Sequence, residues 1–209
     1  MERVIEPGCL QLAVLASGRG SNFTAIKQAI EKGQLNARIC VLISDKKKAA
    51  ALQKAQEAGI PTCFVDPGQY PDREAYESEI VKQLQLFNAD LVILAGYMRL
   101  VGKVLLDTFK FRILNIHPAL LPSFTGLHAQ RQAVDYGVKF SGCTVHFVDA
   151  GMDTGPIIMQ SVVPVYDDDS EASLSDRILI EEHKIYSRAI QLIAEGKLYI
   201  EGRKVIVVN

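Results

Sequence analysis

The chain has 209 residues, 48% of them apolar and 22% charged, which fits a folded globular protein and excludes a disordered one. Lys and Arg number 23 against 24 Asp and Glu, so a net charge of -1 excludes binding of nucleic acid by bulk charge. No apolar run reaches the roughly 18 residues of a membrane helix. The polar first eight residues do not read as a signal peptide. The four cysteines form no C-x-x-C pair, so we expect reduced thiols in a cytoplasmic protein.

The first half of the chain alternates short apolar runs with amphipathic stretches. Strands are predicted at residues 10–16, 37–44, 60–65 and 90–95. Helices are predicted between them at 21–32, 47–58 and 71–86, the first with Ser21 as its N-cap and Gly33 as its stop. This alternation predicts a mostly parallel sheet with helices on both faces.

The second half breaks the alternation. A helix is predicted at 97–109, a strand at 112–116 and a helix at 129–136, followed by two strands at 141–148 and 156–165 that form an antiparallel addition. The longest helical pattern covers 170–194, and Glu201-Gly202 divides 198–208 into a hairpin. Because no linker or repeat interrupts the chain, we expect one α/β domain over 1–209, built on a single continuous, doubly wound sheet.

A glycine-rich loop, Ser17-Gly18-Arg19-Gly20-Ser21-Asn22, joins the first predicted strand to the first helix. Such a turn exposes backbone N–H groups at the positive end of the helix dipole, where an anion binds. Phe23 stands where a dinucleotide fingerprint has its third glycine, and the Lys of a P-loop is missing. The loop therefore predicts a phosphate monoester as ligand, with a tight turn that binds nothing as the alternative.

Polar side chains end the predicted strand at 112–116. Asn115 and His117 alternate along the chain, so both point to one face at the edge where open α/β sheets hold ligands. An amide and an imidazole side by side can both donate to an oxygen that becomes negative during acyl transfer. Asp153 lies in the loop between the two antiparallel strands, where it is either a turn residue or a partner that favours the imidazolium form of His117.

Five segments together resemble the phosphoribosylglycinamide formyltransferases, a family of folate-dependent enzymes of purine synthesis. They are S-G-R-G-S-N from residue 17, L-A-G-Y-M-R-L from 94, N-I-H-P-A-L-L-P-S-F-T-G from 115, G-C-T-V-H-F-V from 142 and D-A-G-M-D-T-G-P from 149. The family implies a Rossmann-like formyltransferase fold. Residues 10–110 would form its phosphate-binding part and residues 111–209 its catalytic and folate-binding part.

The resemblance implies formyl transfer from 10-formyltetrahydrofolate to the primary amine of glycinamide ribonucleotide (GAR), without a metal. By motif position the catalytic group is Asn115, His117 and Asp153. The loop that holds the substrate phosphate is matched by Gly20, Ser21 and Asn22. In such a reaction His117 and Asn115 would stabilise the tetrahedral oxyanion, and Asp153 would keep His117 charged and accept the amine proton.

Further residues are assigned by the same resemblance. Glu182 matches a helix carboxylate near the substrate amine and ribose, and His128 fits a supporting position close to the active centre. His146 alternates with Val145 and Phe147 on a predicted strand near the site, where a structural role is favoured over a supporting one. The folate pocket is matched by Arg73, Met98, Arg99, Leu100, Val101, Asn115, Asp149, Ala150, Gly151, Met152 and Asp153.

Other activities compete with this one. A formyltetrahydrofolate hydrolase shares the three catalytic residues but usually adds an N-terminal regulatory domain, for which this chain has no room. A methionyl-tRNA formyltransferase adds an RNA-binding domain, and a nicotinamide dehydrogenase needs the missing third glycine. A non-catalytic folate or phosphate sensor is the alternative from another class. We expect small-molecule substrates, no nucleic acid or membrane partner, and a monomer or homodimer; the sequence leaves the isomer of the Leu121-Pro122 bond open.

Overall fold

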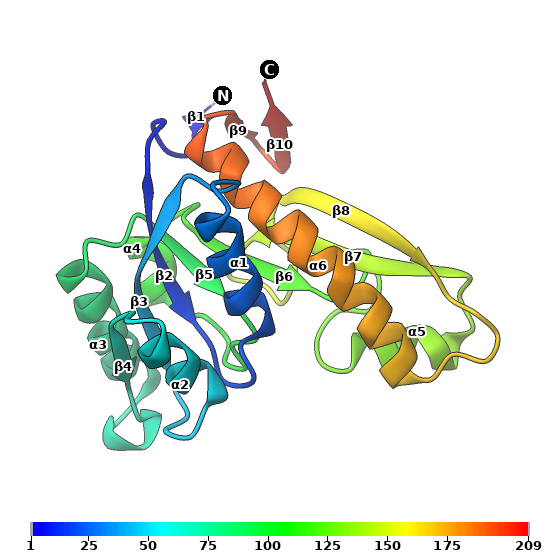
Figure 1. Ribbon diagram of the computed structural model, residues 1–209, viewed down its shortest axis with the longest axis horizontal. Helices are drawn as coiled ribbons and strands as arrows, with labels where there is room; N and C mark the ends of the chain where they lie inside the picture. Colours follow the sequence, from blue (N-terminus) through cyan, green and yellow to red (C-terminus); the bar gives the residue numbers. More distant parts are fainter. Residues whose placement is uncertain (1, 209) are drawn as a thin grey trace.

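A computed structural model describes residues 2–208 and centres on a seven-stranded sheet of order β4-β3-β2-β5-β6-β7-β8 (Figure 1). Neighbouring strands from β4 to β6 are parallel, whereas β7 runs antiparallel to β6 and β8 antiparallel to β7. The predicted α/β class and the antiparallel addition are therefore confirmed. The strands are β2 (Leu10–Leu15), β3 (Ala37–Ser44), β4 (Thr62–Phe64), β5 (Leu91–Leu94), β6 (Ile113–His117), β7 (Phe140–Phe147) and β8 (Ile157–Pro164).

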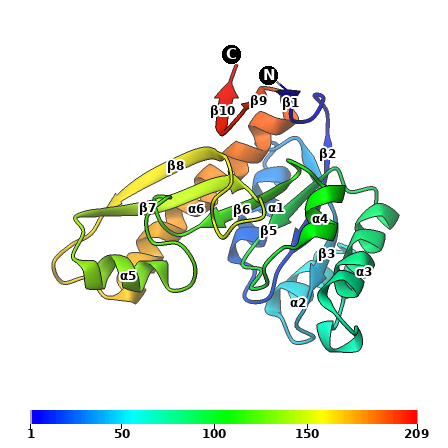
Figure 2. The ribbon, with the colours of Figure 1, turned by 180° about the vertical axis from the view of Figure 1, so that it is seen from behind.

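Helices cover both faces of this sheet, which confirms the doubly wound arrangement. One hydrophobic core gathers residues of α1, α2 and α6 against the sheet, and a second core gathers residues of α3 and α4 on the opposite face. Figure 1 views the α1 and α6 side, and Figure 2 views the side of α3 and α4. The helices are α1 (Ser21–Glu31), α2 (Ala50–Glu57), α3 (Arg73–Leu86), α4 (Lys103–Thr108), α5 (Ala129–Tyr136) and α6 (Glu171–Ala194).

From Leu12 to Leu15, strand β2 is apolar throughout because it contributes to both cores. In β2, Leu12 and Val14 enter the first core, while Ala13 and Leu15 enter the second, and all four are fully buried. Side chains that alternate between two buried faces leave no polar position along the strand. The apolar run that predicted this strand follows from this double burial.

The expectation of a single continuous sheet is wrong. The C-terminal hairpin, β9 (Leu198–Glu201) and β10 (Lys204–Val207), forms a separate three-stranded antiparallel sheet with β1 (Glu2–Arg3). The long helix α6 carries the hairpin away from the central sheet to the N-terminal end of the chain, where β1 pairs with β9 (Figure 1). Among residues 2–208, no helix combines the length and the apolar character needed to cross a bilayer.

Several predicted helix boundaries are also corrected. Gly20, in the left-handed region with φ 71°, takes the N-cap position of α1, so Ser21 is the first helical residue and not the cap. Helix α2 begins at Ala50 and not at residue 47. Helix α3 begins at Arg73, and the side chain of Asp72 caps it by accepting from the N–H of Ala75 over 2.8 Å.

Candidate active site

The sheet brings three polar segments to one edge. Leu15 at the end of β2 pairs in register with Leu94 of β5, and Leu94 pairs with Asn115 of β6. The carboxyl ends of these parallel strands therefore meet, at the place where open α/β sheets bind ligands. The loop at residues 16–20, the segment at 95–102 and the end of β6 are neighbours for this reason.

His117 is buried at the end of β6, and both of its ring nitrogens face oxygen atoms. Nε2 donates to the carbonyl oxygen of Phe124 over 2.7 Å, and Nδ1 lies 3.4 Å from Oδ2 of Asp153. An imidazolium carries an N–H on each nitrogen, so it can satisfy both acceptors, whereas a neutral ring would place a lone pair against one of the two oxygen atoms. The predicted proximity of His117 and Asp153 is confirmed by this contact.

Asp153 is held in place by main-chain geometry. Its backbone adopts the left-handed conformation with φ 55°, and its Oδ2 accepts a hydrogen bond of 2.8 Å from the N–H of Gly126. The preceding turn is closed by Asp149, whose Oδ1 accepts from the N–H of Gly151 over 3.1 Å and from the hydroxyl of Thr154 over 2.6 Å. Asp149 therefore shapes the loop that presents Asp153.

His146 of β7 lies beside Asn115, its partner in the sheet register. Its Nδ1 donates to the carbonyl oxygen of Phe147 over 2.9 Å, and its Nε2 accepts from Nδ2 of Asn115 over 3.2 Å. Burial lowers the pKa of His146 below its usual value, although the Phe147 carbonyl and Asp153 act in the opposite direction. The ring is therefore neutral, with its proton on Nδ1, and it orients the amide of Asn115.

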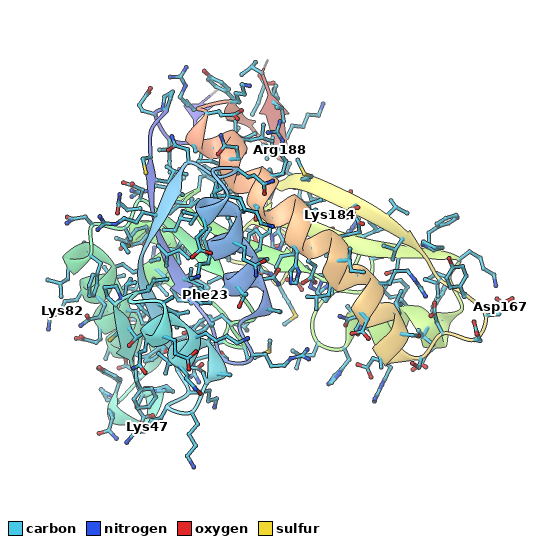
Figure 3. All side chains as sticks on the ribbon, in the orientation of Figure 1. Phe23, Lys47, Lys82, Asp167, Lys184 and Arg188 are labelled. Carbon is cyan, nitrogen blue, oxygen red and sulfur yellow. The ribbon has the colours of Figure 1, made fainter. Side chains whose placement is uncertain are left out.

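The glycine-rich loop has the form expected of an anion site. The first turn of α1 begins directly after Gly20, and a Cβ atom on Gly20 would lie 2.8 Å from Cβ of Ala51. The loop is tied to α2 by the N–H of Ala51, which donates to the carbonyl of Gly18, and by Nζ of Lys54, which donates to the carbonyl of Arg19. Phe23 belongs to α1 (Figure 3) and is fully buried, so a core residue stands at the position of the missing third glycine.

Two of the predicted substrate residues contact each other. Nδ2 of Asn22 in α1 donates to Oε2 of Glu182 in α6 over 2.9 Å. Burial raises the pKa of Glu182 to about 7, against the hydrogen bond from Asn22, which lowers it. Oδ1 of Asn22 is buried and makes no hydrogen bond to the described residues. Helix α6 thus reaches the phosphate loop through one buried polar pair.

The predicted helix over 97–109 is wrong in its first half, because only residues 103–108 form α4. Residues 97–102 form an irregular segment with a bend at Arg99, which is held by α3: Nη2 of Arg73 donates to the carbonyl of Leu100 over 2.8 Å, and the N–H of Gly102 donates to Oε1 of Glu77 over 2.5 Å. The hydroxyl of Ser17 accepts from the N–H of Met98, which joins this segment to the phosphate loop.

Exposed apolar side chains accompany the polar groups. Met98 and Leu100, in the segment at residues 97–102, are 66% and 61% exposed, and Met152, which precedes Asp153, is 50% exposed. A Cβ atom on Gly126 would lie 3.2 Å from the Met152 sulfur, so this methionine lies over the loop that follows His117. Flexible, polarisable side chains of this kind suit the faces of a flat aromatic ligand.

His128 does not join the catalytic group. Its imidazole is exposed and lies 3.3 Å from Glu171 at the start of α6, where Arg131 also pairs with Glu171. Its backbone, with φ 57°, begins α5. Three other groups were missed from the sequence: the carbonyl of Phe124, the N–H of Gly126 and the carboxylate of Glu77. Two are main-chain atoms, and a Glu on a helix gives no signal that it is buried. Among residues 2–208, no cluster of three His, Cys, Asp or Glu side chains could hold a metal ion.

The chain belongs to the formyl transferase family, whose sequence model matches residues 10–190. It is 42% identical to the phosphoribosylglycinamide formyltransferase of Bacillus subtilis (strain 168) over 181 residues, which are 87% of this chain and 93% of that protein. The crystal structure of glycinamide ribonucleotide transformylase 1 from Symbiobacterium toebii matches it with a TM-score of 0.95 at 50% identity, covering 96% of this chain and 95% of that one.

Longer proteins also contain this domain. The chain is 43% identical over 190 residues to the trifunctional purine biosynthetic protein adenosine-3 of Homo sapiens. The match covers 91% of this chain and 19% of that protein, so the chain spans about a fifth of the length of this multifunctional relative.

Proposed function

We propose that this chain transfers the formyl group of 10-formyltetrahydrofolate to the primary amine of GAR in the purine biosynthesis of the cytoplasm, giving formyl-GAR and tetrahydrofolate. The observation that carries the proposal is the grouping of Asn115, His117 and Asp153 at the same sheet edge as the phosphate loop. The names of the relatives support the choice of GAR as acceptor.

The catalytic group acts on charge that develops during the reaction. Attack of the neutral amine on the formyl carbon produces a tetrahedral oxyanion. An N–H of Asn115 donates to it, and the positive charge of the His117 imidazolium, whose own N–H groups face Phe124 and Asp153, stabilises it electrostatically. His146 accepts one N–H of Asn115 and so leaves the second free for the oxyanion. Asp153 stabilises the imidazolium and takes up the amine proton, directly or through water, before that proton passes to the folate nitrogen.

The formyl-folate and GAR bind at different loops. The pteridine of the formyl-folate packs between the apolar side chains Met98, Leu100 and Met152, and the half-exposed guanidinium of Arg73 receives its carboxylate end. The phosphate of GAR binds at Gly20, Ser21 and Asn22, at the N-terminus of α1. Glu182 lies behind Asn22, on the side from which the ribose and the amine extend.

A deformylation assay tests the proposal and its alternatives. The absorbance of 10-formyltetrahydrofolate is followed after addition of the protein, with and without GAR. We expect deformylation only when GAR is present, with formyl-GAR as the product. Deformylation without GAR would indicate the hydrolase, and no deformylation in either cuvette would leave a binding protein without this activity.

A further inference from the structure

A buried carboxylate of α3 lies outside the catalytic group and outside the predicted site. Glu77 is only 2% exposed, and its Oε1 receives two hydrogen bonds, one of 2.5 Å from the N–H of Gly102 and one of 3.1 Å from Nε of Arg73. A carboxylate that is removed from water needs such donors. Both hydrogen-bond donors, Arg73 and Gly102, belong to elements that we assign to the formyl-folate site, so Glu77 links that site to the core.

By accepting from Nε of Arg73, Glu77 also determines which edge of the Arg73 guanidinium is free to bind a ligand. The group has a side edge, formed by Nε and Nη2, and an end edge, formed by Nη1 and Nη2. On the side edge, Nε donates to Glu77 and Nη2 donates to the carbonyl of Leu100 over 2.8 Å. The side chain of Arg73 remains 50% exposed. The end edge therefore keeps its N–H groups for a carboxylate that approaches from solvent.

We propose that Glu77 is a positioning residue of the formyl-folate site: it fixes the end edge of Arg73 toward the carboxylate of the formyl-folate and holds the segment at residues 98–102 in place against the pteridine ring. This inference rests on the proposed function and names a residue that acts through Arg73 and Gly102 and not on the reacting atoms. Because GAR binds at the glycine-rich loop, Glu77 affects the binding of the formyl-folate and not the binding of GAR.

Steady-state kinetics of Glu77→Gln test the inference. The amide keeps the size of the side chain but removes the charge that pairs with Arg73. We expect the KM for 10-formyltetrahydrofolate to rise about tenfold, since a hydrogen bond to a charged group is lost, while kcat and the KM for GAR stay within about twofold of wild type. The matched control is Glu79→Gln on the same helix, whose carboxylate pairs with Lys82 and accepts a hydrogen bond from Gln83. It should leave all three parameters within about twofold.

A double-mutant cycle separates positioning from general stability. Arg73→Lys alone should also raise the donor KM, and combining it with Glu77→Gln should add little, because both changes disable the same contact. Independent, additive effects would overturn the inference. So would equal rises in the KM for GAR and for the donor, or a fall in kcat alone, because a merely structural role produces those results.

Calorimetric titration with folic acid gives a readout that does not depend on transfer or on the acceptor. Glu77→Gln should weaken folic acid binding about tenfold relative to wild type and to Glu79→Gln. If wild-type protein binds folic acid and the variant binds it less tightly, but no formyl group reaches GAR, the proposed function fails and the role of Glu77 stands. If wild type transfers the formyl group and the variant binds folic acid equally well, the role of Glu77 fails alone.

Discussion

Asn22 and Glu182 are 160 residues apart in the chain and share a buried hydrogen bond of 2.9 Å between Nδ2 and Oε2. The bond joins the first turn of α1, directly after the phosphate loop, to the middle of α6. A carboxylate at this depth is costly to charge, and its titration therefore affects the stability of the whole fold.

We expect Glu182 to make the protein less stable as the pH rises from about 4.5 to about 7. Burial raises the pKa of this group in the folded protein to about 7 from an ordinary value of 4.5, so the unfolded chain loses the proton first. Glu182→Gln should remove this slope and be more stable than wild type at pH 8, by a few kcal/mol at most, since one pKa unit corresponds to about 1.4 kcal/mol. Urea denaturation at pH 5 and pH 8 measures the difference.

The adjacent Glu181 provides the control for that experiment. Hydrogen bonds from Lys184 and Ser161 lower the pKa of Glu181, so it is ionised in both states across this pH range. Glu181→Gln should therefore keep the wild-type slope between pH 5 and pH 8. An unchanged slope in Glu182→Gln would show that Glu182 is not the group responsible.

Removing His117 at the end of β6, or its partner Asp153, should nearly abolish formyl transfer. His117→Ala and Asp153→Asn each remove one side of a 3.4 Å contact, and loss of an oxyanion donor typically lowers the rate by ~10²–10³. The far-UV circular dichroism should stay unchanged. Asp167→Asn, at the far end of the molecule (Figure 3), is the matched carboxylate control and should retain wild-type activity. Activity of both site variants within tenfold of wild type would exclude the catalytic assignment.

We expect His146→Ala to lower kcat about tenfold with little change in either KM, because Nδ2 of Asn115 loses the acceptor that orients it. Since burial lowers the pKa of His146, the wild-type ring should remain neutral at pH 7. Long-range nitrogen–proton NMR spectra should show the proton on Nδ1. A ring protonated on both nitrogens at pH 7 would contradict this arrangement.

Alanine substitutions of two glycines at opposite ends of α1 distinguish the effect of backbone strain from the effect of a steric contact. Gly20 and Gly33 have φ values of 71° and 68°, but only at Gly20 would a Cβ meet another atom, Cβ of Ala51 at 2.8 Å. Gly33→Ala should cost about 1–2 kcal/mol of stability from conformation alone. Gly20→Ala should cost more and should also raise the KM for GAR, because the phosphate loop must shift. Equal effects of the two changes on stability and on KM would show that the loop tolerates the contact.

Much of the fold was predictable because burial leaves a regular trace in the sequence. The strands β2 to β5 lie within two residues of their predicted bounds, since apolar residues predominate in them and those of β2, β3 and β5 are largely buried. Gly33 and Gly59, both with positive φ, mark the ends of α1 and α2 as expected. The residues alone left Asp153 as either a turn residue or a partner of His117, the resemblance implied the pairing, and the two side chains are in contact at 3.4 Å.

The failures come from contacts between distant parts of the chain. Residues 97–102 were predicted to be helical, yet they stay irregular because Arg73 and Glu77 hold Leu100 and Gly102 from 27 and 25 residues away. The contact of His128 with Glu171 was also not foreseen from the sequence, while the supporting role that the resemblance implies for His128 stays a prediction. No local pattern encodes either pairing.

His117 and Asp153 contact each other, and each is also held by a main-chain group. The carbonyl of Phe124 holds His117, and the N–H of Gly126 holds Asp153, with Thr125 exposed between them. Every amino acid supplies a carbonyl, and every one except proline supplies an N–H. The site can therefore tolerate mutational drift in the exposed side chain at position 125 while its two anchors persist, so long as the path of the chain through this turn is kept.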